Sequence, residues 1–249
     1  MNVRDEHVLR ELNLYPLWVR RGVPAQQELA PAPVVLEAVP EVNTAAPVAE
    51  TAAVADIPHV VSIPDVAALD WSALKDKVRD CTACKLRAGC TQTVFGVGDE
   101  QADWLFVGEG PGAEEDAQGE PFVGQAGKLL DNMLFSIGLK RGDKVYIANV
   151  VKCRPPNNRT PEADEIATCL PYLQQQIALI KPKLIVALGK TAATALLGRD
   201  ATLGSLRGTT YDFHGTPLIV TYHPAYLLRS PAEKARAWQD LQAAVSLMR

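Results

Sequence analysis

The sequence predicts an α/β fold, a three-layer α/β/α sandwich around a four-stranded, mostly parallel sheet. Four apolar segments have the length and composition of buried strands, at 103–108, 144–151, 183–189 and 216–222. The first three are each followed by sequence of helical periodicity, at 125–137, 161–180 and 190–197. Apolar strands that alternate with helices are typical of a parallel sheet that is covered on both faces.

The composition is that of a folded protein with a core of ordinary size. The chain has 249 residues, of which 47% are hydrophobic, and a net charge of -4, which excludes a broadly basic nucleic-acid coat but not a local basic stripe. No apolar stretch is long enough to span a bilayer, and the N-terminus is too charged for a secretory signal. We therefore expect a cytoplasmic protein that binds no membrane. We also expect a monomer.

The first 64 residues differ in composition from the rest of the chain. Residues 23–64 are rich in alanine and proline and contain no lysine or arginine, which predicts a disordered linker. Residues 1–22 are either a frayed tail or a docking peptide, because Tyr15 and Trp18 are costly to expose without a partner. The stretch RDEHVLRELNLYPLWVRR resembles the N-terminal segment of the psi subunit of the bacterial clamp loader. That resemblance implies the chi subunit of DNA polymerase III as a partner.

The folded domain, 65–249, contains a glycine-rich turn at 107–127 that follows its first predicted strand. Such a strand-to-helix turn is where open α/β sheets place their ligand site. Gly108, Gly110 and Gly112 are expected to leave room for a substrate against bare backbone amides. Several carboxylates and the lack of a Gly-Lys-Ser/Thr ending argue against a phosphate-binding loop.

Four of the five cysteines form two widely separated pairs. Cys81 and Cys84 make a CxxC sequence, Cys153 ends the second predicted strand, and Cys169 follows sixteen residues later. In a reducing compartment such cysteines suit an iron-sulfur cluster or a structural zinc ion, with buried free thiols as the alternative. The fifth, Cys90, is expected to be a packing residue.

Pro171 is expected to break the helical segment 161–180 beside Cys169, because proline lacks an amide hydrogen. The break would direct the Cys169 sulfur outward, next to a new helix N-terminus that favours a thiolate.

Three further residues are expected near the same end of the sheet. Asn149 lies inside an apolar strand, and a buried amide needs partners, either loop backbone or a ligand with both a donor and an acceptor edge. His223 follows the last strand, and Phe122 follows the glycine-rich turn. Each has a purely structural alternative: a hydrogen-bonded histidine and a core aromatic residue.

With these pieces assembled, the sequence resembles the family 4, iron-sulfur uracil-DNA glycosylases over roughly residues 70–249. The segments GEGPGAEEDAQGEPFVGQAGKLLDNML, NVVKCRPPNNRTP and HPAYLLR match the motifs of that family in order and spacing. The four paired cysteines match its cluster ligands. The resemblance implies a uracil-DNA glycosylase fold, a [4Fe-4S] cluster on Cys81, Cys84, Cys153 and Cys169, and uracil-containing DNA, single- or double-stranded, as the substrate.

The resemblance also implies that the protein excises uracil and leaves an abasic site during base excision repair, and it implies roles for three residues in that reaction. Phe122 would stack on the flipped base, Asn149 would read its Watson-Crick edge, and His223 would donate to uracil O2.

The carboxylate that orients water is less directly implied. Family 1 relatives have an aspartate at the position of Gly110. Glu109 is therefore the first candidate for this role. Glu115 is the second candidate, or else the wall that excludes the methyl group of thymine.

Contacts with DNA are expected from residues around the pocket. Leu227 or Leu228 would wedge into the gap left by the base, and the cations expected near phosphates are Arg154, Arg159, Lys190, Arg207 and Arg229. A lyase reaction would need an amine nucleophile, and no family motif places Lys152 or Lys190 in the pocket. We therefore expect a monofunctional enzyme.

Two alternatives remain open at this point. The covalent uracil-trapping branch of the superfamily also carries a cluster, but it has a histidine-bearing insertion after the second strand that RPPNNRTP lacks. The other alternative is a non-catalytic adaptor that binds DNA and recruits the replication machinery through residues 1–22.

Overall fold

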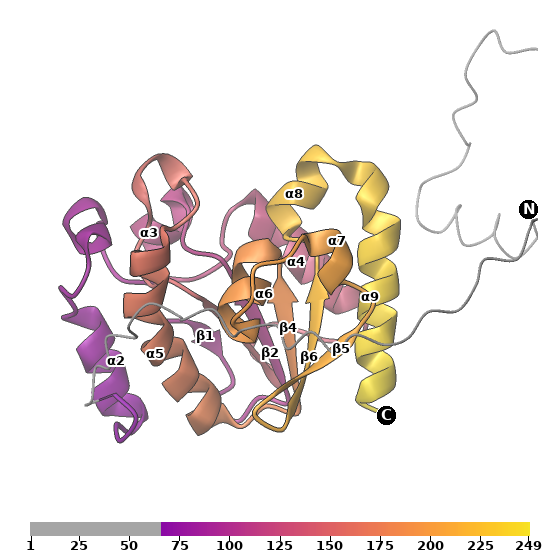
Figure 1. Cartoon of the computed structure of the whole chain (residues 1–249), viewed down its shortest axis with the longest axis horizontal. Helices are drawn as coiled ribbons and strands as arrows, with labels where there is room; N and C mark the ends of the chain where they lie inside the picture. Colours follow the sequence, from indigo (N-terminus) through magenta and orange to yellow (C-terminus); the bar gives the residue numbers. More distant parts are fainter. Residues whose placement is uncertain (1–65) are drawn as a thin grey trace, which may run out of the picture. The chain divides into compact units, whose positions relative to one another are not determined.

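A mixed sheet of six strands lies at the centre of the computed structural model, which describes residues 66–249 (Figure 1). The strands are β1 (Val97–Gly98), β2 (Trp104–Gly108), β3 (Val145–Asn149), β4 (Leu184–Leu188), β5 (Thr210–Phe213) and β6 (Thr216–Thr221). Their order across the sheet is β1-β3-β2-β4-β6-β5. The predicted docking peptide, 1–22, and linker, 23–64, lie outside the described residues.

The four inner strands are the four that the sequence predicts, and they are parallel to one another. The sheet differs from the prediction at its edges, where β1 and β5 each pair antiparallel. β1 has only two residues, and three of the four residues of β5 are not buried. Neither strand carries the buried apolar run by which the inner strands can be recognised.

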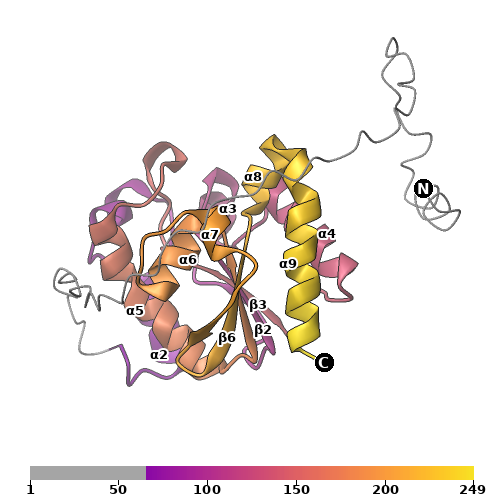
Figure 2. The ribbon, with the colours of Figure 1, turned by 45° about the vertical axis from the view of Figure 1, so that its right-hand side comes forward.

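Helices cover both faces of the sheet, as predicted (Figure 2). Successive side chains of a strand point to opposite faces. Leu105 and Val107 therefore pack against one helical layer, and Trp104 and Phe106 against the other. The first layer contains α2 (Trp71–Arg79), α5 (Ala163–Ile180), α6 (Lys190–Leu197) and α7 (Leu203–Leu206), and the second contains α4 (Gln125–Ser136) and α9 (Lys234–Leu247).

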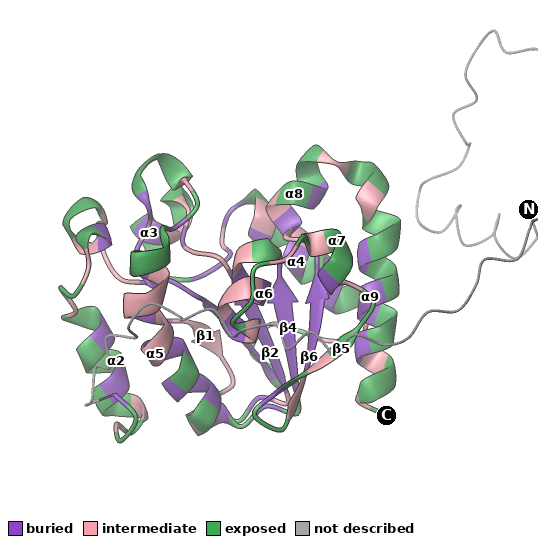
Figure 3. Ribbon diagram, in the orientation of Figure 1, coloured by how far each residue is buried: buried purple, intermediate pink, exposed green. Residues whose placement is uncertain are grey.

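The remaining helical segments are short and lie mostly in loops. They are α3 (Ala113–Gln118), α8 (Pro224–Arg229) and three 3-10 turns, η1 (Lys85–Gly89), η2 (Pro156–Asn158) and η3 (Pro231–Glu233). β2, β3 and β4 are buried along their whole length and β6 over its last four residues, whereas the outer surfaces of the helices are exposed (Figure 3). Among the described residues no helix has both the length and the apolarity needed to cross a membrane.

The predicted helix break at Pro171 is wrong. α5 runs without interruption through Pro171, and its buried residues lie on both sides of the proline, including Cys169 and Leu173. Packing of this apolar face against the sheet outweighs the one backbone hydrogen bond that proline removes. Cys169 is consequently buried and is not directed outward beside a new helix N-terminus.

The strand order creates a natural crevice at the carboxyl ends of the parallel strands. β2 has β3 on one side and β4 on the other. The loop after β2 leads towards α4 on one face, and the loop after β4 leads into α6 on the other face. The loops that follow β2 and β4 therefore diverge, and open α/β sheets bind ligands at such a switch point.

Candidate active site

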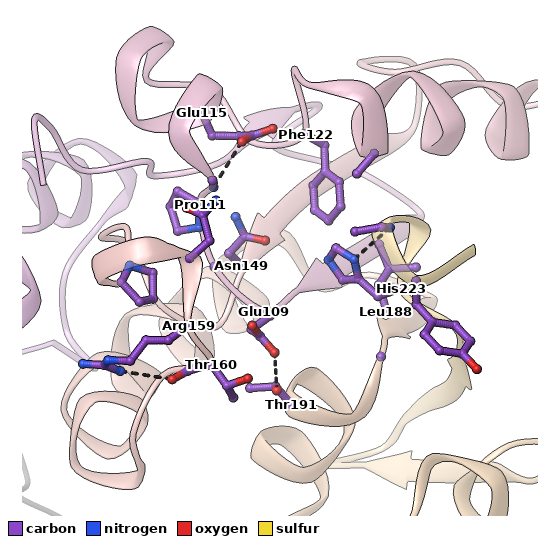
Figure 4. Close-up of a pocket in the computed structure, with 18 of the residues that line it drawn as sticks. Glu109, Pro111, Glu115, Phe122, Asn149, Arg159, Thr160, Leu188, Thr191 and His223 are labelled. Atoms are coloured by element: carbon purple, nitrogen blue, oxygen red, sulfur yellow. Dashed lines mark hydrogen bonds between the residues drawn. The ribbon is translucent and has the colours of Figure 1, made fainter. Parts of the chain in front are cut away.

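A cavity of about 590 Å³ opens at this switch point. It is lined by the loops that follow β2, β3, β4 and β6 (Figure 4). The structure brings together around it all six pocket residues selected from the sequence, namely Glu109, Gly110, Glu115, Phe122, Asn149 and His223.

Asn149 is the last residue of β3 and lies at the inner end of the cavity. Its residue exposure is 1%, and its side-chain oxygen Oδ1 is buried with no hydrogen-bond donor in reach among residues 66–249. A buried amide oxygen without a partner costs about 1–3 kcal/mol. A ligand that offers an N–H group to this atom would recover that free energy.

Phe122 stands beside Asn149 and adopts an unusual backbone conformation, with φ of 56°. Both side chains close over Gly108, where an added β-carbon would lie 2.4 Å from Asn149 Oδ1 and 2.5 Å from the Phe122 ring. The glycine at 108 thus makes room for two protein side chains. Gly110 does the same for Val151, whose methyl group would be 2.7 Å from an added β-carbon. A side chain at either position would collide with these neighbours, and Gly110 also lines the cavity.

His223 caps the N-terminus of α8. Its Nδ1 accepts a hydrogen bond from the Ala225 amide at 3.2 Å, so the neutral ring carries its proton on Nε2. Burial of the imidazole, together with the positive charge of Arg229, lowers the pKa of His223 to about 4. The ring lies 5.5 Å from that of Phe122, centroid to centroid. His223 is therefore a neutral N–H donor at the cavity wall.

The two candidate carboxylates differ in how they are held. Glu109 follows β2 and accepts a hydrogen bond from the hydroxyl of Thr191, at the start of α6. Glu115 accepts three backbone hydrogen bonds, from Gly112 at 3.1 Å and from Val123 and Gly124 at 3.0 Å each. Both oxygens of Glu115 are thus occupied by the protein, whereas Glu109 has one hydrogen-bond partner among residues 66–249.

The four paired cysteines line a second, smaller cavity between η1 and α5. Its volume is about 10 Å³, and within residues 66–249 no three such side chains are close enough to ligate one metal ion. Burial raises the pKa of Cys84, Cys153 and Cys169 above the ordinary thiol value. The fifth thiol, Cys90, is partly buried and contacts Arg87.

The structure corrects two of the predicted DNA contacts. Leu227 is 1% exposed and packs against α4 and α9, whereas Leu228 is 44% exposed. Arg207 forms two hydrogen bonds with Asp240, at 2.8 and 2.9 Å, and stacks on the ring of Tyr222. Leu227 and Arg207 are therefore structural residues. A helix of six residues buries one of two adjacent leucines, and the sequence alone does not say which.

The other predicted cations lie nearer the cavity. Arg229 lines it and is exposed, and Arg154 is partly exposed and hydrogen-bonds Asn158 at 2.7 Å. Arg159 also lines the cavity, although its guanidinium is held by Glu165 at 2.7 and 2.8 Å.

Among the polar lining residues that the sequence analysis did not select are Thr191 and Tyr226. Thr191 lies in the first turn of α6, two residues after Gly189, which follows β4. Tyr226 comes three residues after His223, so the two share a face of α8. Tyr226 is 39% exposed at the cavity and stacks on Tyr222 with ring centroids 5.3 Å apart. For Tyr226 the spacing from His223 was an available signal, whereas Thr191 is marked only by its hydrogen bond to the distant Glu109.

Comparison with known proteins identifies the fold and the family. Residues 95–242 match the uracil DNA glycosylase superfamily. The chain is 45% identical over 181 residues to a type-4 uracil-DNA glycosylase of Pyrobaculum aerophilum, covering 70% of this chain and 92% of the relative. It is also 45% identical over 180 residues to the type-4 enzyme of Thermotoga maritima, covering 71% of this chain and 93% of that relative. It is 46% identical over 170 residues to the type-4 enzyme of Archaeoglobus fulgidus, covering 64% of this chain and 85% of that relative. The chain therefore belongs to the uracil DNA glycosylase superfamily and, within it, to the type-4 uracil-DNA glycosylases.

Proposed function

We propose that this protein excises uracil from DNA by hydrolysing the N-glycosidic bond, and that it leaves an abasic site for base excision repair. The observation that carries the proposal is the buried, unpartnered Oδ1 atom of Asn149 at the inner end of a cavity flanked by Phe122 and His223. The names of the type-4 relatives, each called a uracil-DNA glycosylase, support the choice of base.

Asn149 would select uracil by its hydrogen-bonding edge. Uracil presents an N–H at N3 and an acceptor at O4, so the Asn149 amide accepts from the first with Oδ1 and donates to the second. Cytosine presents an acceptor at N3 and a donor at the 4-position, which leaves both groups of the amide unpaired. Buried polar groups left unpaired give discrimination on the order of 10⁴-fold or more.

The base reaches this amide only after leaving the helix. Enzymes that act on a base extrude it into a pocket, and a uracil opposite guanine is cheaper to extrude than a paired base. The Phe122 ring would cover one face of the extruded base. Leu228, exposed on α8, would fill the gap left in the stack.

His223 would stabilise the leaving group. As the glycosidic bond breaks, negative charge develops on uracil O2, and the Nε2–H of a neutral imidazole donates to it. Arg229 supplies positive charge near the same ring, as its effect on the His223 pKa indicates. One well-placed donor of this kind contributes about 3 kcal/mol to the transition state.

Glu109 would orient the attacking water and stabilise the sugar cation. Thr191 holds its carboxylate in the cavity. Glu115 suits this role less well, because three backbone amides already occupy its oxygens. Its fixed position instead suits a wall that excludes the methyl group of thymine.

The four paired cysteines would hold the [4Fe-4S] cluster that type-4 membership implies. Their chemistry fits, since the four thiols face one cavity and a cubane binds each thiolate at a different iron. When bound, the cluster would tie the loop at 81–90 to α5 and to the end of β3.

The lysines near the strand ends support a monofunctional enzyme. Lys152 is buried away from the cavity, where its Nζ donates to the Asn149 carbonyl at 2.9 Å and to Gln176 at 2.6 Å. Lys190 lines the cavity but pairs with Asp200 at 2.8 Å. Borohydride should consequently trap no Schiff-base adduct with abasic DNA.

The test of the proposal is product analysis with a uracil-containing oligonucleotide. Protein purified without oxygen is mixed with excess substrate, and free uracil, abasic strand and protein-DNA adduct are separated. We expect several equivalents of free uracil per protein and an alkali-labile strand. A stable covalent adduct would instead indicate the trapping branch. Intact DNA would favour the non-catalytic adaptor.

The partner proposal for residues 1–22 rests on the sequence alone. Deletion of residues 1–64 should abolish binding to the chi subunit and leave excision from short oligonucleotides unchanged. Retention of chi binding by the truncated protein would refute the proposed docking peptide.

A further inference from the structure

The aromatic residue at the cavity is held in a backbone conformation that its own type disfavours. Phe122 has φ of 56°, in the left-handed region that side chains with a β-carbon rarely adopt. Such a conformation persists only when surrounding groups fix it. The groups that fix Phe122 therefore control where its ring points.

The carbonyl groups of this turn are bound by one arginine. Arg141 donates from Nη1 to the carbonyl of Pro121 at 2.9 Å and from Nη2 to the carbonyl of Phe122 at 2.8 Å. Its Nε donates to Asp131 of α4 at 3.0 Å, and Nη2 lies 2.8 Å from the same carboxylate oxygen. The Arg141 side chain is 23% exposed, so this contact is partly shielded from water.

The chain geometry explains why Arg141 reaches this turn. α4 ends at Ser136, and the short turn that follows, closed by a bridge between Lys140 and Asp143, reverses the chain. This reversal places the Arg141 guanidinium within hydrogen-bond distance of Asp131 and of the Phe122 carbonyl. Neither Arg141 nor Asp131 lines the cavity, so Arg141 acts behind the aromatic ring.

The amide side of the same turn is held independently. Glu115 accepts from the amides of Val123 and Gly124, the two residues after Phe122. Gly127 packs so closely that an added β-carbon would lie 1.7 Å from the Phe122 carbonyl oxygen. Carbonyls held by a cation and amides held by an anion leave the turn little freedom.

We propose that Arg141 is a positioning residue for uracil excision, which acts by holding the Pro121 and Phe122 carbonyls so that the Phe122 ring faces the extruded base. This inference rests on the proposed function, in which Phe122 stacks on uracil. The planar fork of arginine spans two carbonyl oxygens at once, whereas a lysine ammonium is a single point donor. Lysine at 141 should therefore restore only part of the function.

The test is a double-mutant cycle between Arg141 and Phe122, measured as single-turnover uracil release. Arg141→Ala should lower the rate by about 10²-fold, the loss expected from a displacement near 1 Å at a reacting group. Arg141→Lys should recover part of the loss, and KM for DNA should change little. In a Phe122→Ala background, Arg141→Ala should cost less than about twofold, because coupled residues are not additive.

Two controls keep the outcome interpretable. Arg79→Ala removes an exposed, ion-paired arginine on the other face of the sheet and should leave the rate unchanged. If Arg141→Ala melts below the assay temperature, Asp131→Asn replaces it, since this change loosens the arginine and leaves its charge. It should give a smaller loss that also disappears in the Phe122→Ala background.

The inference is overturned if Arg141→Ala is fully active, or if its loss is equally large with and without Phe122. Failure of the proposed function looks different, because wild-type protein would then release no uracil at all.

Discussion

The side-chain oxygen of Asn149 and the ring of Phe122 close over the same α-carbon, that of Gly108. A methyl group at this position would lie 2.4 Å from the oxygen and 2.5 Å from the ring. Asn149, assigned to reading the base, and Phe122, assigned to stacking on it, can lie this close together because residue 108 has no side chain. The spacing of the recognition site depends on a residue that contributes no atom beyond its backbone.

Gly108→Ala should therefore separate the two groups and lower single-turnover excision by about 10²-fold. Gly204→Ala is the matched control, because an added β-carbon there meets nothing within 4 Å. The excision rates of both variants are measured as uracil release in rapid-quench experiments. Full activity in Gly108→Ala would show that the distance between Asn149 and Phe122 does not matter.

Asn149→Ala should separate activity from stability. The substitution removes the amide that reads uracil, and excision should fall by at least about 10³-fold. It also removes a buried oxygen that no donor within residues 66–249 satisfies, so the free energy of unfolding should change by less than about 1 kcal/mol. Denaturant titration measures this change in the free energy of unfolding. A large loss of stability would mean that Asn149 is a structural asparagine.

His223 should remain neutral throughout the physiological pH range. Its folded-state pKa, about 4, lies below the ordinary value of 6.5, so the folded state resists protonation. The resulting stabilisation is fully present above pH 6.5 and is lost as the pH falls towards 4. Protonation would also put an N–H on Nδ1, opposite the amide of Ala225.

Proton NMR of the imidazole tests this prediction. We expect no titration of His223 between pH 5 and 8, and Arg229→Ala should move the midpoint upward by removing a nearby cation. A midpoint near 6.5 in the wild-type protein would contradict a neutral donor.

The adjacent leucines of α8 should give opposite phenotypes. Leu227→Ala leaves a cavity in the core and should lower the free energy of unfolding by about 2–5 kcal/mol. Leu228→Ala should leave stability nearly unchanged and slow excision from duplex DNA more than from single strands, because only the duplex has a gap to fill. Equal effects of Leu228→Ala on the two substrates would refute the wedge.

The two arginines Arg207 and Arg229 should differ in the same way. Arg207→Ala strands the buried carboxylate of Asp240 and should destabilise the fold by about 3–5 kcal/mol. Arg229→Ala should lower the slope of log affinity against log salt concentration by about 1, as expected for one lost phosphate contact. An unchanged slope would place Arg229 away from the DNA backbone.

The sequence predicted the parts of the fold that have a strong local signal. The four inner strands have uninterrupted apolar runs, and the predicted helix at 190–197 has the bounds of α6. β1 and β5 lack such runs. The predicted helix break at Pro171 was wrong because the helix-breaking preference of proline is overridden by the burial of α5 on both sides of it.

The candidate site divides along similar lines. Asn149, Phe122 and His223 could be selected because each is unusual for its position at a strand end or turn. Thr191 and Arg141 could not, because they act through hydrogen bonds to residues that are 82 and 19 positions away. Leu227 and Leu228 differ only in which side of a short helix faces the core.

The most direct test of the account is the structure of the protein with free uracil bound. We predict that Asn149 Oδ1 accepts a hydrogen bond from uracil N3 at about 2.9 Å. The Phe122 ring should lie against the face of the base, and His223 Nε2 should lie within hydrogen-bond distance of O2. Uracil bound elsewhere in the cavity, with Asn149 Oδ1 still unpartnered, would contradict the assignment of this pocket.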